Sequence, residues 1–241
     1  MPILSLISGL KPKSSILVPM NPQFHADLDT ALASAATPGR APAMRAYMRD
    51  QFEFLGVGTP QRRMAAKPLL KQLKGSGADN ILLCARELWE RPQREYQYVA
   101  IDLLAMHSKE LNLEHIPELL GLAQNKSWWD TVDALASAIS DILHYRHDRM
   151  DQALSHDNMW VRRIALLHQL GWRDHVDMDR LFNYSLRLVH EKEFFIQKAI
   201  GWALRDYARH DPEAVRAFTQ KEKHRLSALS YREANKHLAM P

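Results

Sequence analysis

The feature of this sequence that most constrains its fold is a degenerate repeat of about 32 residues. Large aromatic residues stand at the start of four apolar segments, at Tyr96, Trp128, Trp160 and Phe195, with successive separations of 32, 32 and 35 residues. In three segments a small apolar string follows the aromatic residue, as in Val99–Ile101. Such a period is typical of proteins in which each repeat forms one helical hairpin and successive hairpins stack. The repeat therefore predicts an all-α, curved solenoid.

The spacing of apolar residues within these segments supports helices. Apolar residues recur at intervals of three and four residues, the pattern of an amphipathic helix, and no segment shows the alternation of a strand. The sequence predicts helices over 78–90, 93–107, 129–143, 158–170, 178–190 and 193–209. Proline suits the first helical position after an N-cap residue. Three helix starts are predicted on this basis, at Thr59-Pro60, Arg91-Pro92 and Asp211-Pro212.

We expect one domain over residues 20–241, preceded by a flexible extension over residues 1–19, in which Lys11–Ser15 has a linker-like composition. No apolar stretch is long enough to span a membrane, and the start lacks the basic region of a signal peptide. The single cysteine, Cys84, lies in an apolar run and excludes an internal disulfide. These features predict a buried Cys84 and a cytoplasmic, monomeric protein with no membrane contact.

The net charge is only +4, but the cations are unevenly distributed along the chain. Residues 40–74 contain eight basic and two acidic residues, and residues 198–236 contain nine and five. Residues 75–145 contain five basic and eleven acidic residues. Two basic ends on a curved molecule would suit a polyanion. Ordinary solvated helix faces explain the same counts, so charge alone does not decide between these alternatives.

Trp129 and Asp133 lie one turn apart on a predicted helix and are therefore neighbours on its surface. The stripe that begins at Trp128 continues with large apolar residues and is assigned to the core, whereas Ala136 and Ser140 follow Asp133. An indole beside a carboxylate, with only small residues beyond, predicts an open surface that accepts a cation. Packing at the helix start is the alternative role for Trp129.

A second helix combines tryptophan with cations. Lys198, Trp202, Arg205 and Arg209 share one face of the helix predicted over 193–209. This arrangement suits a nucleic-acid backbone, because cations meet phosphates and an indole meets a sugar or base. A solvated basic face is the alternative, although tryptophan is rarely exposed without a reason.

Two further basic residues, Arg162 and Arg163, follow Trp160 and offer another basic contact, although an exposed helix face is the ordinary explanation. The motifs of zinc proteases, phosphate-binding loops and nucleophile elbows are absent. His144 and His147 lack a third ligand nearby in the sequence. We therefore expect neither a metal nor a cofactor.

Six segments together resemble the bacterial AlkD-type alkylpurine DNA glycosylases over about residues 20–237. They are Arg45–Arg49, Phe54–Val57, Arg86–Trp89, Lys126–Asp133, Asp157–Trp160 and Lys192–Trp202. The resemblance implies a HEAT-like solenoid whose concave, basic groove holds duplex DNA. Gly58 and Gly171 stand where relatives carry larger polar or basic residues.

The resemblance also implies roles for individual residues. By this likeness Asp133, Trp129 and Trp202 are the catalytic residues, and Tyr47 and Arg163 contact the DNA backbone. Lys198 and Arg205 are assigned to further phosphate contacts.

The function that this resemblance implies is excision of cationic N3- or N7-alkylated purines from double-stranded DNA, without an enclosing pocket for the base. Two alternatives stay open: a non-catalytic relative that binds DNA structures, and a protein-interaction scaffold. Asp133 argues against the first. Trp129 and Trp202, placed on stripes that face solvent, argue against the second.

Overall fold

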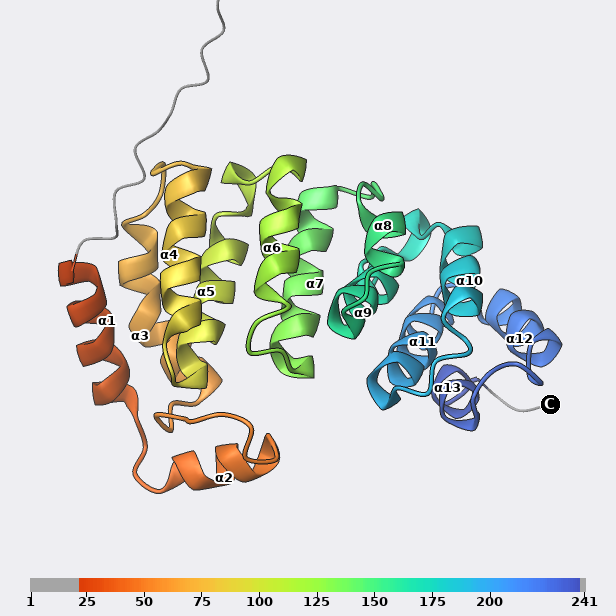
Figure 1. The fold of residues 1–241 in the computed structure, drawn as a ribbon, viewed down its shortest axis with the longest axis horizontal. Coiled ribbons are helices and arrows are strands. Elements are labelled where there is room, and N and C mark those ends of the chain that lie inside the picture. The colour runs from red at the N-terminus through yellow and green to blue at the C-terminus, as the bar shows by residue number, and fades with distance from the viewer. Residues whose placement is uncertain (1–21, 239–241) are drawn as a thin grey trace, which may run out of the picture.

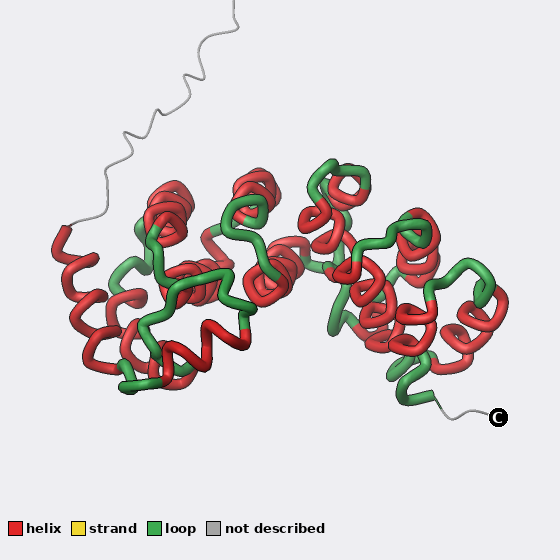
Figure 2. Tube along the Cα trace, turned by 60° about the horizontal axis from the view of Figure 1, so that its bottom comes forward, coloured by secondary structure: helices red, strands yellow, loops and turns green. Residues whose placement is uncertain are grey.

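A computed structural model of the chain describes residues 22–238, so the expected extension over residues 1–19 lies outside the described part. Regular secondary structure in this range is helical, apart from an isolated bridge between Glu53 and Gln93. Figure 2 accordingly draws helices and loops and no strand within the described residues. None of the helices over 22–238 combines the length and apolar character that a membrane crossing requires.

The helices follow one another closely along the chain. The α-helices are α1 (Pro22–Ala35), α2 (Arg40–Tyr47), α3 (Thr59–Lys71), α4 (Ala78–Glu90), α5 (Arg94–Met106), α6 (Ile116–Leu122), α7 (Trp129–Leu143), α8 (Met150–Leu154), α9 (Met159–Leu167), α10 (Met178–Arg187), α11 (Phe194–Tyr207), α12 (Pro212–Lys221) and α13 (Ala228–Ala234). Short 3-10 helices lie at Ser108–Glu110, Leu113–His115 and Arg173–His175.

The helices form two layers along a curved path (Figure 1). Helices α3, α5, α7, α9 and α11, here called the inner layer, each pack against the next member of the series. Helices α4, α6, α8, α10 and α12 pack on the inner layer from one side, while α1 packs on α3 and α13 on α11. This stacking of helix pairs confirms the all-α, helical-repeat architecture predicted from the sequence.

The aromatic residues of the repeat meet in space. The Trp128 ring lies 6.0 Å from the Trp160 ring and 5.1 Å from the Phe195 ring, and Trp160 lies 5.0 Å from Phe195, all between centroids. Tyr96 does not join them, because its hydroxyl donates to Asp29 at 2.6 Å. The spacing of the repeat thus places three aromatic side chains at the junctions between α7, α9 and α11.

The helix boundaries correct some expectations. The ranges 78–90 and 129–143 are confirmed, and the Asp211 carboxylate caps α12 by accepting from the Ala214 N–H at 2.9 Å. Thr59 lies inside α3, whose N-cap is Gly58. Arg91 is the C-cap of α4 rather than an N-cap, because proline restricts the preceding residue to an extended backbone and so ends that helix. The next helix begins at Arg94, with Gln93 as its N-cap.

Candidate active site

A cavity of about 320 Å³ lies where α7, α9, α11 and α13 meet. Its lining residues are Trp129, Asp133, Arg163, Phe194, Phe195, Lys198, Trp202, Arg205 and Glu233. The structure therefore brings together six of the seven residues to which the sequence resemblance assigned a catalytic or DNA-binding role. The seventh, Tyr47, lies beside the cavity. Within residues 22–238 no three histidine, cysteine, aspartate or glutamate side chains converge as a metal site would need.

Arg94, a fully buried residue of α5, fixes the start of α7, which carries Trp129. Its guanidinium donates from Nε and Nη2 to the Asp130 carboxylate at 3.0 and 2.7 Å, and from Nη1 to the Lys126 carbonyl at 2.7 Å. The Phe52 ring covers the guanidinium at 3.8 Å from its centroid. The sequence analysis missed Arg94, because a single arginine at a helix start carries no pattern of its own.

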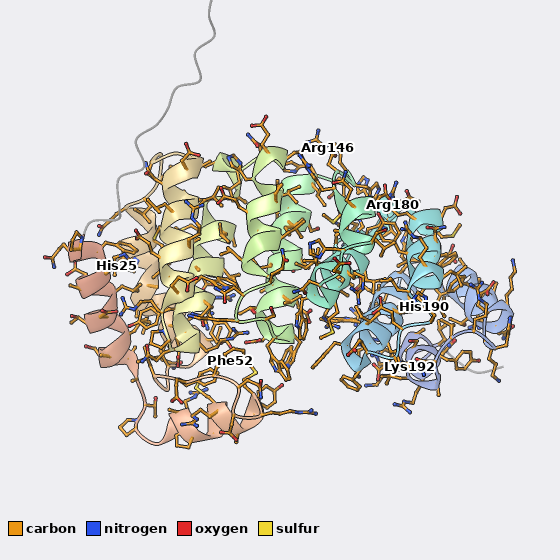
Figure 3. All side chains as sticks on the ribbon, in the orientation of Figure 1. His25, Phe52, Arg146, Arg180, His190 and Lys192 are labelled. Carbon is orange, nitrogen blue, oxygen red and sulfur yellow. The ribbon has the colours of Figure 1, made fainter. Side chains whose placement is uncertain are left out.

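Tyr47 reaches Trp129 from α2, which Figure 1 shows set apart from the stacked pairs. The two rings meet edge to face with centroids 6.0 Å apart, and Tyr47 is 70% exposed. The segment after α2, in which Figure 3 labels Phe52, returns to the layers at the start of α5, where the Arg94 N–H donates to the Glu53 carbonyl at 2.8 Å. There the buried Glu95 carboxylate accepts from the backbone N–H groups of residues 55, 56 and 57 at 2.9 to 3.0 Å. This anchor holds α2 and therefore Tyr47 beside the cavity.

Asp133 is held by a two-pronged ion pair. Arg163 Nε donates to Oδ1 at 2.7 Å, and Nη2 donates to Oδ2 at 2.8 Å. The side chains of Asp133 and Arg163 are only 14% and 4% exposed. Burial raises the pKa of the Asp133 carboxyl above its usual range, while the Arg163 guanidinium acts in the opposite direction.

Arg163 therefore does not lie on an exposed basic face. The remaining guanidinium nitrogen, Nη1, donates to the Phe195 carbonyl. The Arg163 side chain therefore connects α9 to both α7 and α11. Arg162, its sequence neighbour, points elsewhere and pairs with Glu191 at 2.7 and 2.8 Å. In the free protein the group assigned to the DNA backbone is thus a partner of the catalytic candidate.

The open stripe expected beyond Asp133 is shorter than the sequence suggested. Ala136 is 2% exposed, and the Ser140 hydroxyl accepts from Trp172 Nε1 at 2.5 Å. Ala136 is therefore closed off from solvent, while Ser140 is half-buried and occupied by the Trp172 indole. Of this stripe, Trp129 and Asp133 are the residues that line the cavity.

Helix α11 supplies the opposite wall. Lys198, Trp202 and Arg205 share its cavity face, as the helical spacing predicts. Arg209 lies outside the lining, is 71% exposed in its side chain and approaches Asp206 at 3.9 Å. The start of α11 adds Phe194 and Phe195 to the lining. The sequence pattern placed Phe195 only among the aromatic residues of the repeat and assigned neither residue to the site, although adjacent aromatic residues at a helix start were a visible signal.

Both cations of this wall are paired with Glu233 of α13. Lys198 Nζ lies 2.8 Å from Oε1, and Arg205 Nη1 donates to Oε2 at 2.7 Å. The hydrogen bond from Lys198 is the main cause that lowers the pKa of the Glu233 carboxyl. Sequence reasoning missed Glu233 because α13 is short and was not predicted, although the Ser227 N-cap, which accepts from Ser230 N–H at 3.0 Å, was visible as a Ser-x-x-Ser pattern.

Comparisons with known proteins agree on one family. The profile of the DNA alkylation repair enzyme family matches residues 28–238. A solved structure described as a predicted DNA alkylation repair enzyme from Enterococcus faecalis is 32% identical, with a TM-score of 0.79, covering 86% of this chain and 98% of that one. AlkD2 from Streptococcus mutans is 18% identical with a TM-score of 0.61, covering 83% and 100% of the two chains, and this second likeness concerns the fold alone.

No curated protein matches the chain. The family profile nevertheless spans most of its length, and the first structural likeness extends over nearly the whole of the other protein. The chain therefore belongs to the DNA alkylation repair enzyme family and has its AlkD-type helical-repeat fold.

Proposed function

We propose that this protein is a DNA glycosylase that hydrolyses the N-glycosidic bond of cationic N3- or N7-alkylated purines in duplex DNA. The observation that carries the proposal is the position of Asp133, whose carboxylate lies in a cavity with Trp129 and Trp202 among its walls. A carboxylate among aromatic faces is the arrangement that a positively charged reaction centre requires.

The chemistry assigned to these groups follows from the substrate. An alkylated purine that already carries a positive charge leaves without protonation, so the developing charge on the deoxyribose is what needs stabilisation. Asp133 supplies the opposite charge from a largely buried position, where electrostatic stabilisation is stronger than in bulk water. It also orients the attacking water, and the two indoles contact the sugar through their electron-rich faces.

Arg163 has a supporting part in this scheme. Burial alone favours the neutral form of the Asp133 carboxyl, which could not stabilise a cation. The two hydrogen bonds from Arg163 favour the ionised form and fix the plane of the carboxylate. Arg163 is accordingly a positioning residue for Asp133, and a phosphate contact that leaves this role intact would have to use the two guanidinium N–H groups that these bonds leave over.

The composition of the cavity supports selection by the lability of the lesion. Its nine lining side chains are aromatic or charged, and the charged ones are paired with one another, Asp133 with Arg163 and Glu233 with Lys198 and Arg205, rather than left open for a base edge. Neutral lesions such as uracil are therefore expected to be poor substrates, and bulky cationic adducts are expected to be tolerated.

The test is release of N7-methylguanine from a duplex that contains it, with a uracil-containing duplex as the substrate control. The wild type should release the methylated base and Asp133→Asn should release it far more slowly. DNA binding without release by the wild type would indicate a non-catalytic binder of DNA structures. Absence of both would indicate a protein-interaction scaffold.

A further inference from the structure

Glu233 joins two cations that the sequence places two turns apart on α11. One carboxylate oxygen lies 2.8 Å from Lys198 Nζ and the other accepts from Arg205 Nη1 at 2.7 Å. Trp202 stands between these two residues along the helix, and all four side chains line the cavity. The carboxylate thus draws the two cations together beside the indole.

The carboxylate is itself fixed by the packing of α13 on α11. A side chain at Gly201 would bring a Cβ within 2.5 Å of Glu233 Cβ and 2.9 Å of the Ser230 carbonyl, so the helices touch through backbone. The Ser230 hydroxyl donates to the Gln197 carbonyl at 2.8 Å. The Glu233 side chain is 13% exposed. It therefore acts as a rigid anchor for Lys198 and Arg205.

We infer that Glu233 is a positioning residue that holds Lys198 and Arg205 as a clamp for one DNA phosphate next to Trp202. This inference rests on the DNA-binding site of the proposed function, and does not depend on base release. The pairing leaves donors free, because an ammonium has three N–H groups and a guanidinium five. A phosphate can therefore bind both cations while Glu233 keeps its contacts.

Two physical effects of Glu233 on DNA binding oppose each other. Its negative charge repels phosphates, and this effect weakens as salt screens it. Its hydrogen bonds order two long, flexible side chains before DNA arrives, which lowers the entropy lost on binding at any salt concentration. Removal of the charge therefore strengthens binding if repulsion dominates, and weakens it if positioning dominates. The sign of the change decides between them.

The experiment measures the affinity of the full chain for an undamaged duplex. At about 0.2 M salt, where exposed charges are screened, Glu233→Gln should bind roughly three- to tenfold more weakly than the wild type, although it has one negative charge fewer. Glu118→Gln is the control for loss of one negative charge, because Glu118 of α6 pairs with Arg86 of α4, outside the cavity lining. It should bind as tightly as the wild type or more tightly. Equal or tighter binding by Glu233→Gln would overturn the inference.

The same substitution in a protein that already lacks the two cations tests whether Glu233 positions them or only supports the fold. In a chain with Lys198→Gln and Arg205→Gln, the further change Glu233→Gln should not weaken binding, since the cations it positions are gone and only its repulsion of phosphates is removed. A loss that persists there would mean that Glu233 acts through the packing of α13, and would also overturn the inference.

Glu233→Asp keeps the charge and is the variant to use if Glu233→Gln melts below the assay temperature. Its carboxylate is one methylene too short to reach both cations, so the same weakening is expected, and wild-type affinity would refute the clamp. All of these arms use undamaged DNA. Failure to release a methylated base would therefore reject the proposed glycosylase and leave this result standing.

Discussion

Arg163 meets Asp133 side-on, with two nitrogen atoms of the guanidinium donating to the two carboxylate oxygens at 2.7 and 2.8 Å. The pair bridges α9 and α7, and both side chains are largely buried. Such geometry fixes the direction of the carboxylate as well as its charge, because a planar fork and a planar acceptor fit in one orientation. The orientation of the catalytic candidate is therefore decided by a residue of a different helix.

Replacing Arg163 by lysine should slow base release while keeping the charge of the site. An ammonium donates as a point charge and cannot hold both carboxylate oxygens in a plane, and a displacement of the order of 1 Å at a reacting group costs roughly 100-fold in rate. Single-turnover release of N7-methylguanine measures the change, and thermal unfolding checks the fold. A wild-type rate of base release by this variant would show that Asp133 does not need the bidentate Arg163 guanidinium to be oriented.

Replacing Trp202 by alanine should slow base release without changing the salt dependence of DNA binding. The indole is neutral and releases no counterions, whereas loss of one phosphate contact lowers the magnitude of the log–log salt slope by about 1. Lys198→Gln is the comparison that should show that lower slope. Titration of a lesion-containing duplex at several salt concentrations measures both variants. An altered slope for Trp202→Ala would assign the indole to the support of Lys198 and Arg205 instead.

His168 should make folding stability depend on pH. Its ring is fully buried, its Nδ1–H donates to the Ala165 carbonyl at 2.6 Å, and its Nε2 lies 2.9 Å from His147 Nδ1. Burial lowers the pKa of His168 from 6.5 to about 3. Between these values the unfolded chain binds a proton that the folded protein does not, so stability falls as pH falls, by up to about 1.4 kcal/mol per pH unit.

His168→Gln removes this titration and should flatten the pH dependence of stability. Urea unfolding at about pH 7 and about pH 5 measures the difference for both proteins. The wild type should lose more free energy of unfolding than the variant over that interval. Parallel losses in the two proteins would assign the acid sensitivity to other groups.

Replacing Gly201 by alanine should destabilise the C-terminal end of the solenoid. The added Cβ would meet Glu233 Cβ at 2.5 Å and the Ser230 carbonyl at 2.9 Å, so backbone has to move. Overpacking of this kind costs about 1–3 kcal/mol. Denaturant unfolding measures the loss. Gly121→Ala is the control, because a Cβ at Gly121 would have no side chain and no backbone of another helix within 4 Å. Helix α6 should therefore keep its packing.

Sequence periodicity was sufficient to predict α7, α9 and α11, because an amphipathic pattern reports which face of a helix is buried, but it did not predict α2 or α13. The start of α7 and the shared face of Lys198, Trp202 and Arg205 follow from this local rule. The burial of Arg163 does not follow from it. That burial depends on the distance between neighbouring helices in the inner layer, which no local pattern contains.

Long-range partners were beyond the same reasoning. Glu233 lies on a helix of seven residues, too short for a clear amphipathic period, and its two cations are 28 and 35 positions away in the sequence. Arg94 likewise acts on Asp130 across 36 positions. Both residues carry charges whose roles depend on which helix stacks next to which.

Trp129 and Trp202 belong to α7 and α11, which are two steps apart in the inner layer with α9 between them. In a helical-repeat protein each unit contacts only its neighbours, so small rotations at successive interfaces add up. The width between the two indoles is therefore a sum of two interface angles. A substitution at the α7–α9 or α9–α11 interface would therefore change the distance between Trp129 and Trp202 without altering either residue.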